Sequence, residues 1–144
     1  MFRPRSGQVE VLLAHPGGPF FRNRDAGHWT IPKGEADGDE ELLAVARREF
    51  EEETGSVPPD GDAIDLGSIV QKGGKVVHAW AFEGDLDPAT AESNTFEMVW
   101  PPGSGRVQAF PEIDRVAWFD VDEARRRVKP TQIPLIDRLV DALG

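Results

Sequence analysis

Short runs of alternating apolar and polar residues fill much of the chain, and three stretches show the longer period of a helix. Residues 7–14 alternate and then become continuously apolar, as an opening strand would. Two further runs, 63–71 and 75–83, flank Gly73 and Gly74, which are typical of a hairpin turn. Shorter extended segments are predicted at 29–32, 96–100 and 115–119. Helices are predicted over 40–54, 121–128 and 132–143. Strands around one central helix, with further helical sequence at the end, predict an α/β sandwich with a mixed sheet.

The predicted helix over 40–54 carries both an apolar stripe and a cluster of acids. The residues that should face the core are Leu42, Leu43, Ala46 and Phe50. At 3.6 residues per turn, Glu49, Glu52 and Glu53 are related as i, i+3 and i+4 and share one face. Glu53 falls inside the apolar arc, with the other two beside it, whereas Glu51 points to solvent.

The ends of this helix also have sequence signals. Asp37 and Asp39 are candidate N-caps, and Glu40 follows the first of them by three residues, as in a capping box. Gly55 is a natural residue to end the helix.

Three acids at the buried edge of one helix require an explanation. A solvated acidic helix end is the alternative, but the macrodipole disfavours acids at a helix C-terminus, and desolvation penalises each carboxylate. A divalent cation would compensate these charges, and such oxygen ligands suit Mg²⁺ or Mn²⁺. The pattern therefore predicts a metal site.

Composition narrows the function classes. The chain has 144 residues and no cysteine, so we expect one domain over 1–144 without disulfides or thiolate chemistry, and a cytoplasmic location. No apolar stretch approaches the length needed to span a membrane. The net charge is −10, and residues 34–55 hold nine acids against two arginines. Such a field argues against nucleic-acid binding and favours a small phosphorylated ligand met through metal ions.

Residues 34–55 resemble the Nudix box, G-x5-E-x7-R-E-U-x-E-E-x-G-U, where U is a bulky apolar residue. The matching positions are Gly34, Glu40, Arg48, Glu49, Phe50, Glu52, Glu53 and Gly55. Ser56 occupies the final apolar position, and we expect Val57 to take over its packing. The resemblance implies a Nudix-type α/β/α sandwich with a central mixed β-sheet, and a hydrolase acting on a nucleoside diphosphate linked to another moiety.

The same resemblance implies roles for individual residues. Glu49, Glu52 and Glu53 would hold one or more Mg²⁺ ions, and Mn²⁺ is possible. Family members often take a further glutamate from a loop shortly before a tryptophan-containing strand. Glu112, six residues before Trp118, is the best match for that ligand or base, and Glu97 is the alternative.

Substrate contacts are expected outside the glutamates. Residues 29–34, W-T-I-P-K-G, resemble the entry to the box in dinucleoside polyphosphate hydrolases, where Lys33 would reach a phosphate. Arg48 pairs with a neighbouring acid or contacts phosphate, and Arg106 is a candidate phosphate or ribose contact. It lies in the irregular segment 84–110, where we expect specificity.

A base-stacking residue is harder to assign. The tyrosine that such hydrolases carry beyond the box is missing, because the chain has no tyrosine, so His78 or Trp80 would replace it.

A dinucleoside polyphosphate or a nucleoside triphosphate is therefore the expected substrate. The alternative function is a non-hydrolytic nucleotide-sensing module on the same fold. The sequence gives no indication of oligomeric state.

Overall fold

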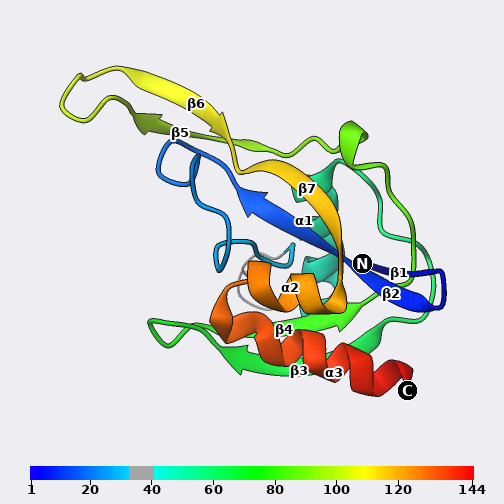
Figure 1. Cartoon of the computed structure of the whole chain (residues 1–144). Coiled ribbons are helices and arrows are strands. Elements are labelled where there is room, and N and C mark those ends of the chain that lie inside the picture. The colour runs from blue at the N-terminus through cyan, green and yellow to red at the C-terminus, as the bar shows by residue number, and fades with distance from the viewer. Residues whose placement is uncertain (33–40) are drawn as a thin grey trace.

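The computed structural model describes residues 1–32 and 41–144, and its strands form three antiparallel ladders (Figure 1). The first ladder has the order β1–β2–β7, with bounds Phe2–Arg5, Gln8–Pro16 and Ile113–Asp120. The second pairs β3 (Ile64–Val70) with β4 (Val76–Ala81). The third pairs β5 (Thr95–Val99) with β6 (Val107–Pro111). The helices are α1 (Leu42–Thr54), α2 (Val121–Arg127) and α3 (Ile133–Leu143), with short 3₁₀ turns at Pro88–Thr90 and Pro130–Gln132.

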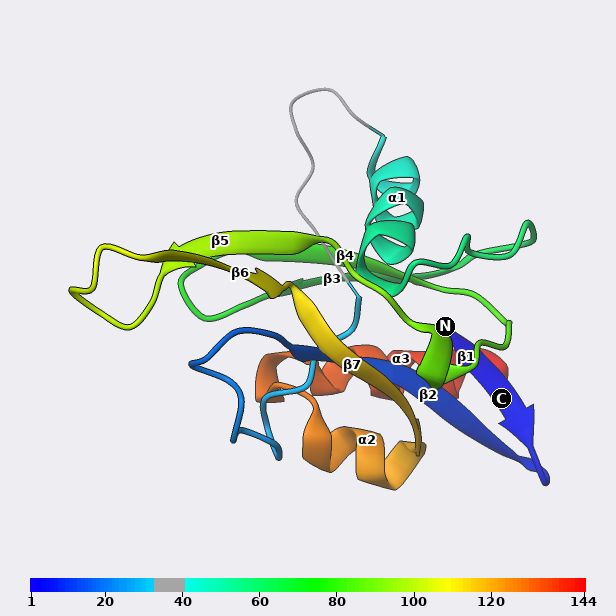
Figure 2. The same cartoon turned by 90° about the horizontal axis from the view of Figure 1, so that it is seen from above.

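The helices lie on two sides of the strands. Helix α1 lies on one side, and α2 and α3 lie on the other (Figure 2). Parallel pairing occurs at isolated bridges, Phe2 with Glu83 and Trp29 with Val128, and these supply the mixed character expected of the sheet. The predicted α/β sandwich with mixed strand pairing is thus confirmed.

Strand β2 is buried on both faces, which explains why its sequence is continuously apolar. Val11 and Leu13 pack in the cluster on the α3 side. Leu12 and Ala14 point the other way and pack with Phe50 of α1. A strand covered on both faces loses the alternation of a half-exposed one. Because β2 touches both layers, it fixes α1 relative to the rest of the domain.

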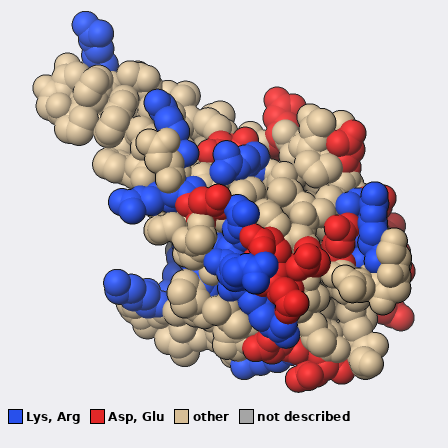
Figure 3. Space-filling model, viewed as in Figure 1, with Lys and Arg blue, Asp and Glu red and all other residues tan. Residues whose placement is uncertain are grey.

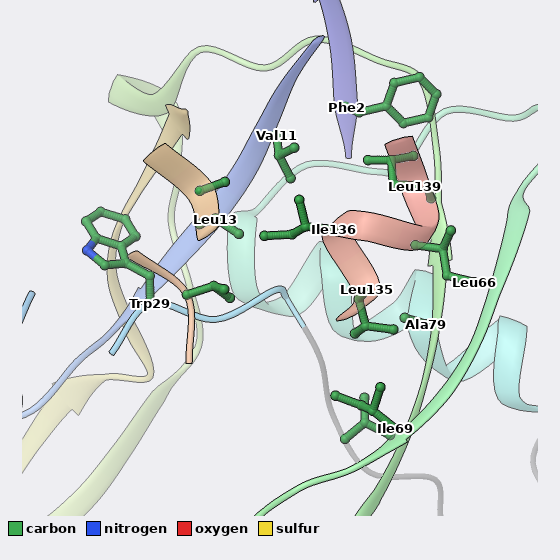
Figure 4. Packing of buried hydrophobic residues seen from close by; sticks show 14 residues of the cluster. Phe2, Val11, Leu13, Trp29, Leu66, Ile69, Ala79, Leu135, Ile136 and Leu139 are labelled. Carbon is green, nitrogen blue, oxygen red and sulfur yellow. The ribbon is translucent and has the colours of Figure 1, made fainter. Parts of the chain in front are cut away.

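Helix α3 fills the space between β2 and the β3–β4 ladder. Its Leu135, Ile136 and Leu139 are almost fully buried among side chains from β2, β3 and β4 (Figure 4). On β4, the buried residues are Val77, Ala79 and Ala81, which alternate along the strand and so share one face. The opposite face of β4 is turned away from this cluster.

Two strands escaped the sequence prediction. β1 buries only Phe2, and β6 has four exposed residues out of five, so neither run carries an apolar period. β6 forms with β5 a two-stranded arm that projects from the domain (Figures 1 and 2). The segment 84–110 is therefore partly regular.

None of the helices in the described ranges 1–32 and 41–144 is long and apolar enough to cross a bilayer.

Candidate active site

Helix α1 ends as the sequence predicts. Gly55 has φ of 76°, in the left-handed region, and its N–H donates to the Glu51 carbonyl at 2.7 Å. A β-carbon at Gly55 would lie 2.8 Å from the Glu92 carbonyl oxygen, so the next segment passes close to the helix end. Glycine is required here by both the backbone angle and the close approach. The predicted N-cap residues Asp37 and Asp39, with Glu40, lie outside the described residues.

Of the four residues expected to face the core, Phe50 is buried, Leu43 and Ala46 are half-buried and Leu42 is exposed, and Val45 is buried instead. The buried side chains are Val45, Phe50, Glu53 and Thr54. Leu42 is 48% exposed, because it begins the helix and has core neighbours on one side alone.

The packing role expected for Val57 is also wrong, since this side chain is 71% exposed. The turn after the helix is closed by polar groups instead. The buried Thr54 hydroxyl donates to the Phe50 carbonyl (2.7 Å) and accepts the Ser56 N–H (3.2 Å). This contact uses the Ser56 backbone N–H, so closing the turn requires no apolar side chain at this position.

The three glutamates of α1 that are candidate metal ligands differ in how far they are exposed to solvent. Glu53 is buried at 8% exposed, as its place in the apolar arc predicts. The Glu49 side chain is 15% exposed and that of Glu52 is 39% exposed, while Glu51 points to solvent. Burial raises the pKa of the Glu49 carboxyl; the Arg48 guanidinium opposes this rise and the charge of Glu52 adds to it. The helix thus concentrates negative charge at a partly desolvated surface.

Arg48 lies against this acidic face. Its Nη2 is 3.4 Å from Glu49 Oε1, and its Nε is 3.8 Å from Glu52 Oε1. The expected pairing with a neighbouring acid is therefore present. At 42% exposed, the guanidinium also remains open to solvent on one side.

Glu112 lies at the junction of β6 and β7 and is connected to α1 through the backbone of Asn94. The Asn94 N–H donates to the Glu52 carbonyl (2.9 Å), and the Asn94 carbonyl accepts the Glu112 N–H (2.8 Å). The Glu112 side chain is exposed. Glu97, the alternative, is exposed further along the β5–β6 arm, opposite Ala109. The structure therefore brings Glu112 to the acidic end of α1 and leaves Glu97 on the arm.

Within residues 1–32 and 41–144, no three carboxylate or imidazole groups are gathered closely enough to hold one metal ion. The chemistry of the donors nevertheless fits a hard divalent cation. Three carboxylates share one helix face, and burial already raises the pKa of one of them.

The structure places one of the other two predicted substrate contacts, Arg106. Lys33 lies outside the described residues. Arg106 is exposed in the loop between β5 and β6, where its carbonyl accepts the Trp100 N–H at 2.9 Å. This loop is the far end of the arm, away from α1 (Figures 1 and 2).

A cavity of about 340 Å³ adjoins the N-terminal half of α1. Leu42, Val45 and Ala46 line it on the helix side, and His78 and Trp80 line it from β4. Phe50 also lines the cavity, and it lies between Glu49 and Glu52 along the helix. An apolar cavity and an acidic surface therefore lie side by side.

His78 and Trp80 form a parallel stack at the edge of this cavity. Their ring centroids are 4.2 Å apart, with planes 13° from parallel. Asp65 holds the stack, since its Oδ1 lies 2.6 Å from His78 Nε2. The Gly67 N–H, followed by His78, lowers the pKa of the Asp65 carboxyl. The two rings are two residues apart on one strand, so the sequence predicts that they share a face. The position of Asp65 depends on an irregularity in the β3–β4 pairing between Asp65 and Gly67, which no sequence pattern indicates.

Comparison with known proteins bears on this site. The sequence pattern of the NUDIX domain family matches residues 1–139. Among solved structures, a C. elegans Ap4A hydrolase binary complex has a TM-score of 0.68 at 20% identity, covering 99% of this chain and 92% of the other. The NUDIX domain of Shewanella oneidensis NrtR, complexed with ADP ribose, has a TM-score of 0.65 at 20% identity, with 99% and 83% covered. At these identities both structures show a shared fold.

A curated relative is similar over part of its length. It is an octanoyltransferase of Myxococcus xanthus, 31% identical over 124 residues, which are 86% of this chain and 30% of that protein. The chain thus spans about a third of this relative. The resemblance of residues 34–55 to the Nudix box is confirmed, and the chain belongs to the NUDIX domain family.

Proposed function

We propose that this chain is a Mg²⁺-dependent pyrophosphohydrolase that cleaves a phosphoanhydride bond in a nucleoside diphosphate linked to another moiety. The observation that carries the proposal is the graded face of Glu49, Glu52 and Glu53 on α1. Carboxylates that share one helix face and are partly desolvated are suitable oxygen donors for a divalent cation, and their side chains would move closer together when the ion binds. Mn²⁺ is an alternative ion for the same oxygen donors.

The protein side chains have separate roles in this proposal. Glu49, Glu52 and Glu53 would hold the ion, with Glu112 as a further ligand or general base. When bound, the ion supplies Lewis-acid polarisation of a phosphate oxygen and a more acidic water. Arg48 pairs with Glu49 and Glu52 and so steadies these carboxylates, and by its place beside them it would be a candidate contact for a phosphate oxygen.

The cavity beside α1 favours a nucleotide as the substrate. Its lining is mainly apolar, and the His78–Trp80 stack presents aromatic faces of the kind on which a base stacks. The matched C. elegans and Shewanella structures are named for Ap4A hydrolysis and for bound ADP ribose, both nucleotides. We therefore propose a dinucleoside polyphosphate or a nucleoside triphosphate. Lys33 would contact phosphate by its place in the sequence, and Arg106 would meet only a substrate that extends along the arm.

Surface charge supports a small ligand over a long polyanion. The arginines of α2 are paired with acids: Arg125 with Asp122, and Arg126 and Arg127 with Glu123. Basic and acidic side chains are accordingly interspersed on this face of the protein (Figure 3). Phosphate neutralisation along a polyanion needs a continuous positive surface.

The test combines turnover with binding. Product release is measured with and without Mg²⁺ on a panel of dinucleoside polyphosphates, nucleoside triphosphates and nucleotide sugars, and nucleotide binding is measured by calorimetry. Turnover that requires Mg²⁺ and is abolished in Glu52→Gln is the expected result. Tight nucleotide binding without turnover on the whole panel would contradict the enzyme and favour the sensing module.

A further inference from the structure

A three-residue segment, Glu92 to Asn94, connects the acidic end of α1 with the start of β7. On the α1 side, the Glu92 N–H donates to the Thr54 carbonyl (2.9 Å), and the Asn94 N–H donates to the Glu52 carbonyl (2.9 Å). These carbonyls belong to the last turn of the helix, where backbone acceptors have no partner within the helix. The segment therefore follows any movement of the turn that carries Glu52 and Glu53.

On the β7 side, the same segment holds the backbone around Glu112. The Asn94 carbonyl accepts the Glu112 N–H (2.8 Å), and Ser93 Oγ accepts the Ile113 N–H (3.0 Å). Ser93 Oγ also lies within donating distance of the carbonyl oxygens of Ile113 (3.0 Å) and Asn94 (2.9 Å), and its single proton can be donated to either one. Its side chain therefore contacts backbone groups on both sides of the junction.

A third contact completes the fixation of Glu112. The Gly17 N–H donates to the Glu112 carbonyl (2.8 Å), and a β-carbon on Gly17 would lie within bonding range of the Pro111 carbonyl, so this approach needs glycine. Two N–H groups and one C=O of consecutive residues are thus bound, while the Glu112 side chain stays exposed. A fixed backbone limits the region that the Glu112 carboxylate can reach, so less backbone entropy is lost when it ligates an ion.

We propose that Ser93 is a positioning residue that sets where the Glu112 carboxylate lies relative to Glu52 and Glu53. It acts through the Ile113 backbone and touches neither metal nor substrate. The inference rests on the proposed role of Glu112 at the metal. Outer groups that orient a ligand change metal affinity about 10- to 100-fold when removed, and a backbone anchor one residue away falls at the lower end of that range.

The experiment measures the dissociation constant of Mn²⁺ by electron paramagnetic resonance of the free ion, without substrate. Ser93→Ala should weaken Mn²⁺ binding about tenfold, and Ser93→Thr, which keeps the hydroxyl, should bind within about twofold of wild type. Ser104→Ala is the matched control, because Ser104 Oγ also accepts a backbone N–H, that of Arg106 (3.1 Å), at the far end of the arm. It should leave the affinity unchanged.

A double-mutant cycle separates positioning from general destabilisation. If Ser93 acts through Glu112, Ser93→Ala has no further effect in a Glu112→Gln background. Equal weakening in both backgrounds, or wild-type affinity in Ser93→Ala, would overturn the inference while leaving Glu112 at the metal. Wild-type affinity in Glu112→Gln would instead refute the proposed role of Glu112, and the inference with it. Should Ser93→Ala fail to fold, Ser93→Cys supplies a side chain of similar shape with a weaker hydrogen bond.

Discussion

The end of α1 gives a prediction that follows from two geometric features of Gly55, its φ angle and its distance from Glu92. Its φ of 76° costs a residue with a β-carbon about 1–2 kcal/mol. The new β-carbon would also lie 2.8 Å from the Glu92 carbonyl oxygen, so Glu92 must shift, which threatens its 2.9 Å hydrogen bond to Thr54. A lost hydrogen bond of this kind is worth about 0.5–1.5 kcal/mol. Gly55→Ala should therefore lower the free energy of unfolding by about 2–3 kcal/mol.

Gly7 provides the matched control. It has nearly the same φ, 78°, but no heavy atom within 4 Å of its added β-carbon. Gly7→Ala should lower the free energy of unfolding only by the strain of a β-carbon at positive φ, about 1–2 kcal/mol. The assay is urea unfolding followed by the fluorescence of the four tryptophans. With a slope of about 2 kcal/mol per M, the midpoint of Gly55→Ala should fall about 0.5 M below that of Gly7→Ala. Equal midpoints would refute the claim that Glu92 is pressed against the helix end.

Three further predictions concern the cavity, the core and pH. Trp80→Ala should raise the KM for a nucleotide about tenfold with little change in kcat, since stacking on a base is worth about 1–3 kcal/mol; unchanged KM in steady-state kinetics would contradict it. The Ile31 N–H donates to the side-chain oxygen of the fully buried Gln132 at 2.9 Å, and Gln132→Leu removes this acceptor. The substitution should lower the free energy of unfolding, measured with urea, by about 1–3 kcal/mol. The pKa of Asp25 is lowered, mainly by the hydrogen bond from the Trp29 indole N–H. The ionised carboxylate therefore stabilises the folded state at pH values above 3.8, the ordinary pKa of the group, and this stabilisation is lost as the pH falls through the lowered pKa. Asp25→Asn should therefore be less stable than wild type at pH 7, with a smaller difference in urea midpoints at pH 3; a gap that is independent of pH would contradict this.

The spacing of apolar and polar residues predicted those helices and strands that bury one face in the core. The glutamate face of α1 follows from a spacing of three and four residues, and the burial of Glu53 follows from its place among apolar residues. β2 was predictable because both of its faces are covered. Leu42 was misplaced because a helical wheel does not show where the core ends.

Longer-range features had no comparable signal. β6 packs on β5 rather than on the core, so its sequence needs no apolar alternation. The segment from Glu92 to Asn94 is fixed by backbone groups of residues about 20 to 40 positions away, and backbone hydrogen bonds place little demand on residue type. The position of Glu112 relative to α1 therefore became visible only in three dimensions.

The proposed metal site lies on one face of α1, and four single substitutions test it directly. Hydrolysis of a dinucleoside tetraphosphate is measured at saturating Mg²⁺ for Glu49→Gln, Glu52→Gln, Glu53→Gln and the control Glu51→Gln, which changes an exposed acid of the same helix. The first three should lose at least about 100-fold in kcat/KM, because each removes a ligand worth several kcal/mol in the transition state. Glu51→Gln should retain activity close to wild type. Similar losses in all four variants, or activity that persists in the first three, would contradict the assignment of the metal to this face.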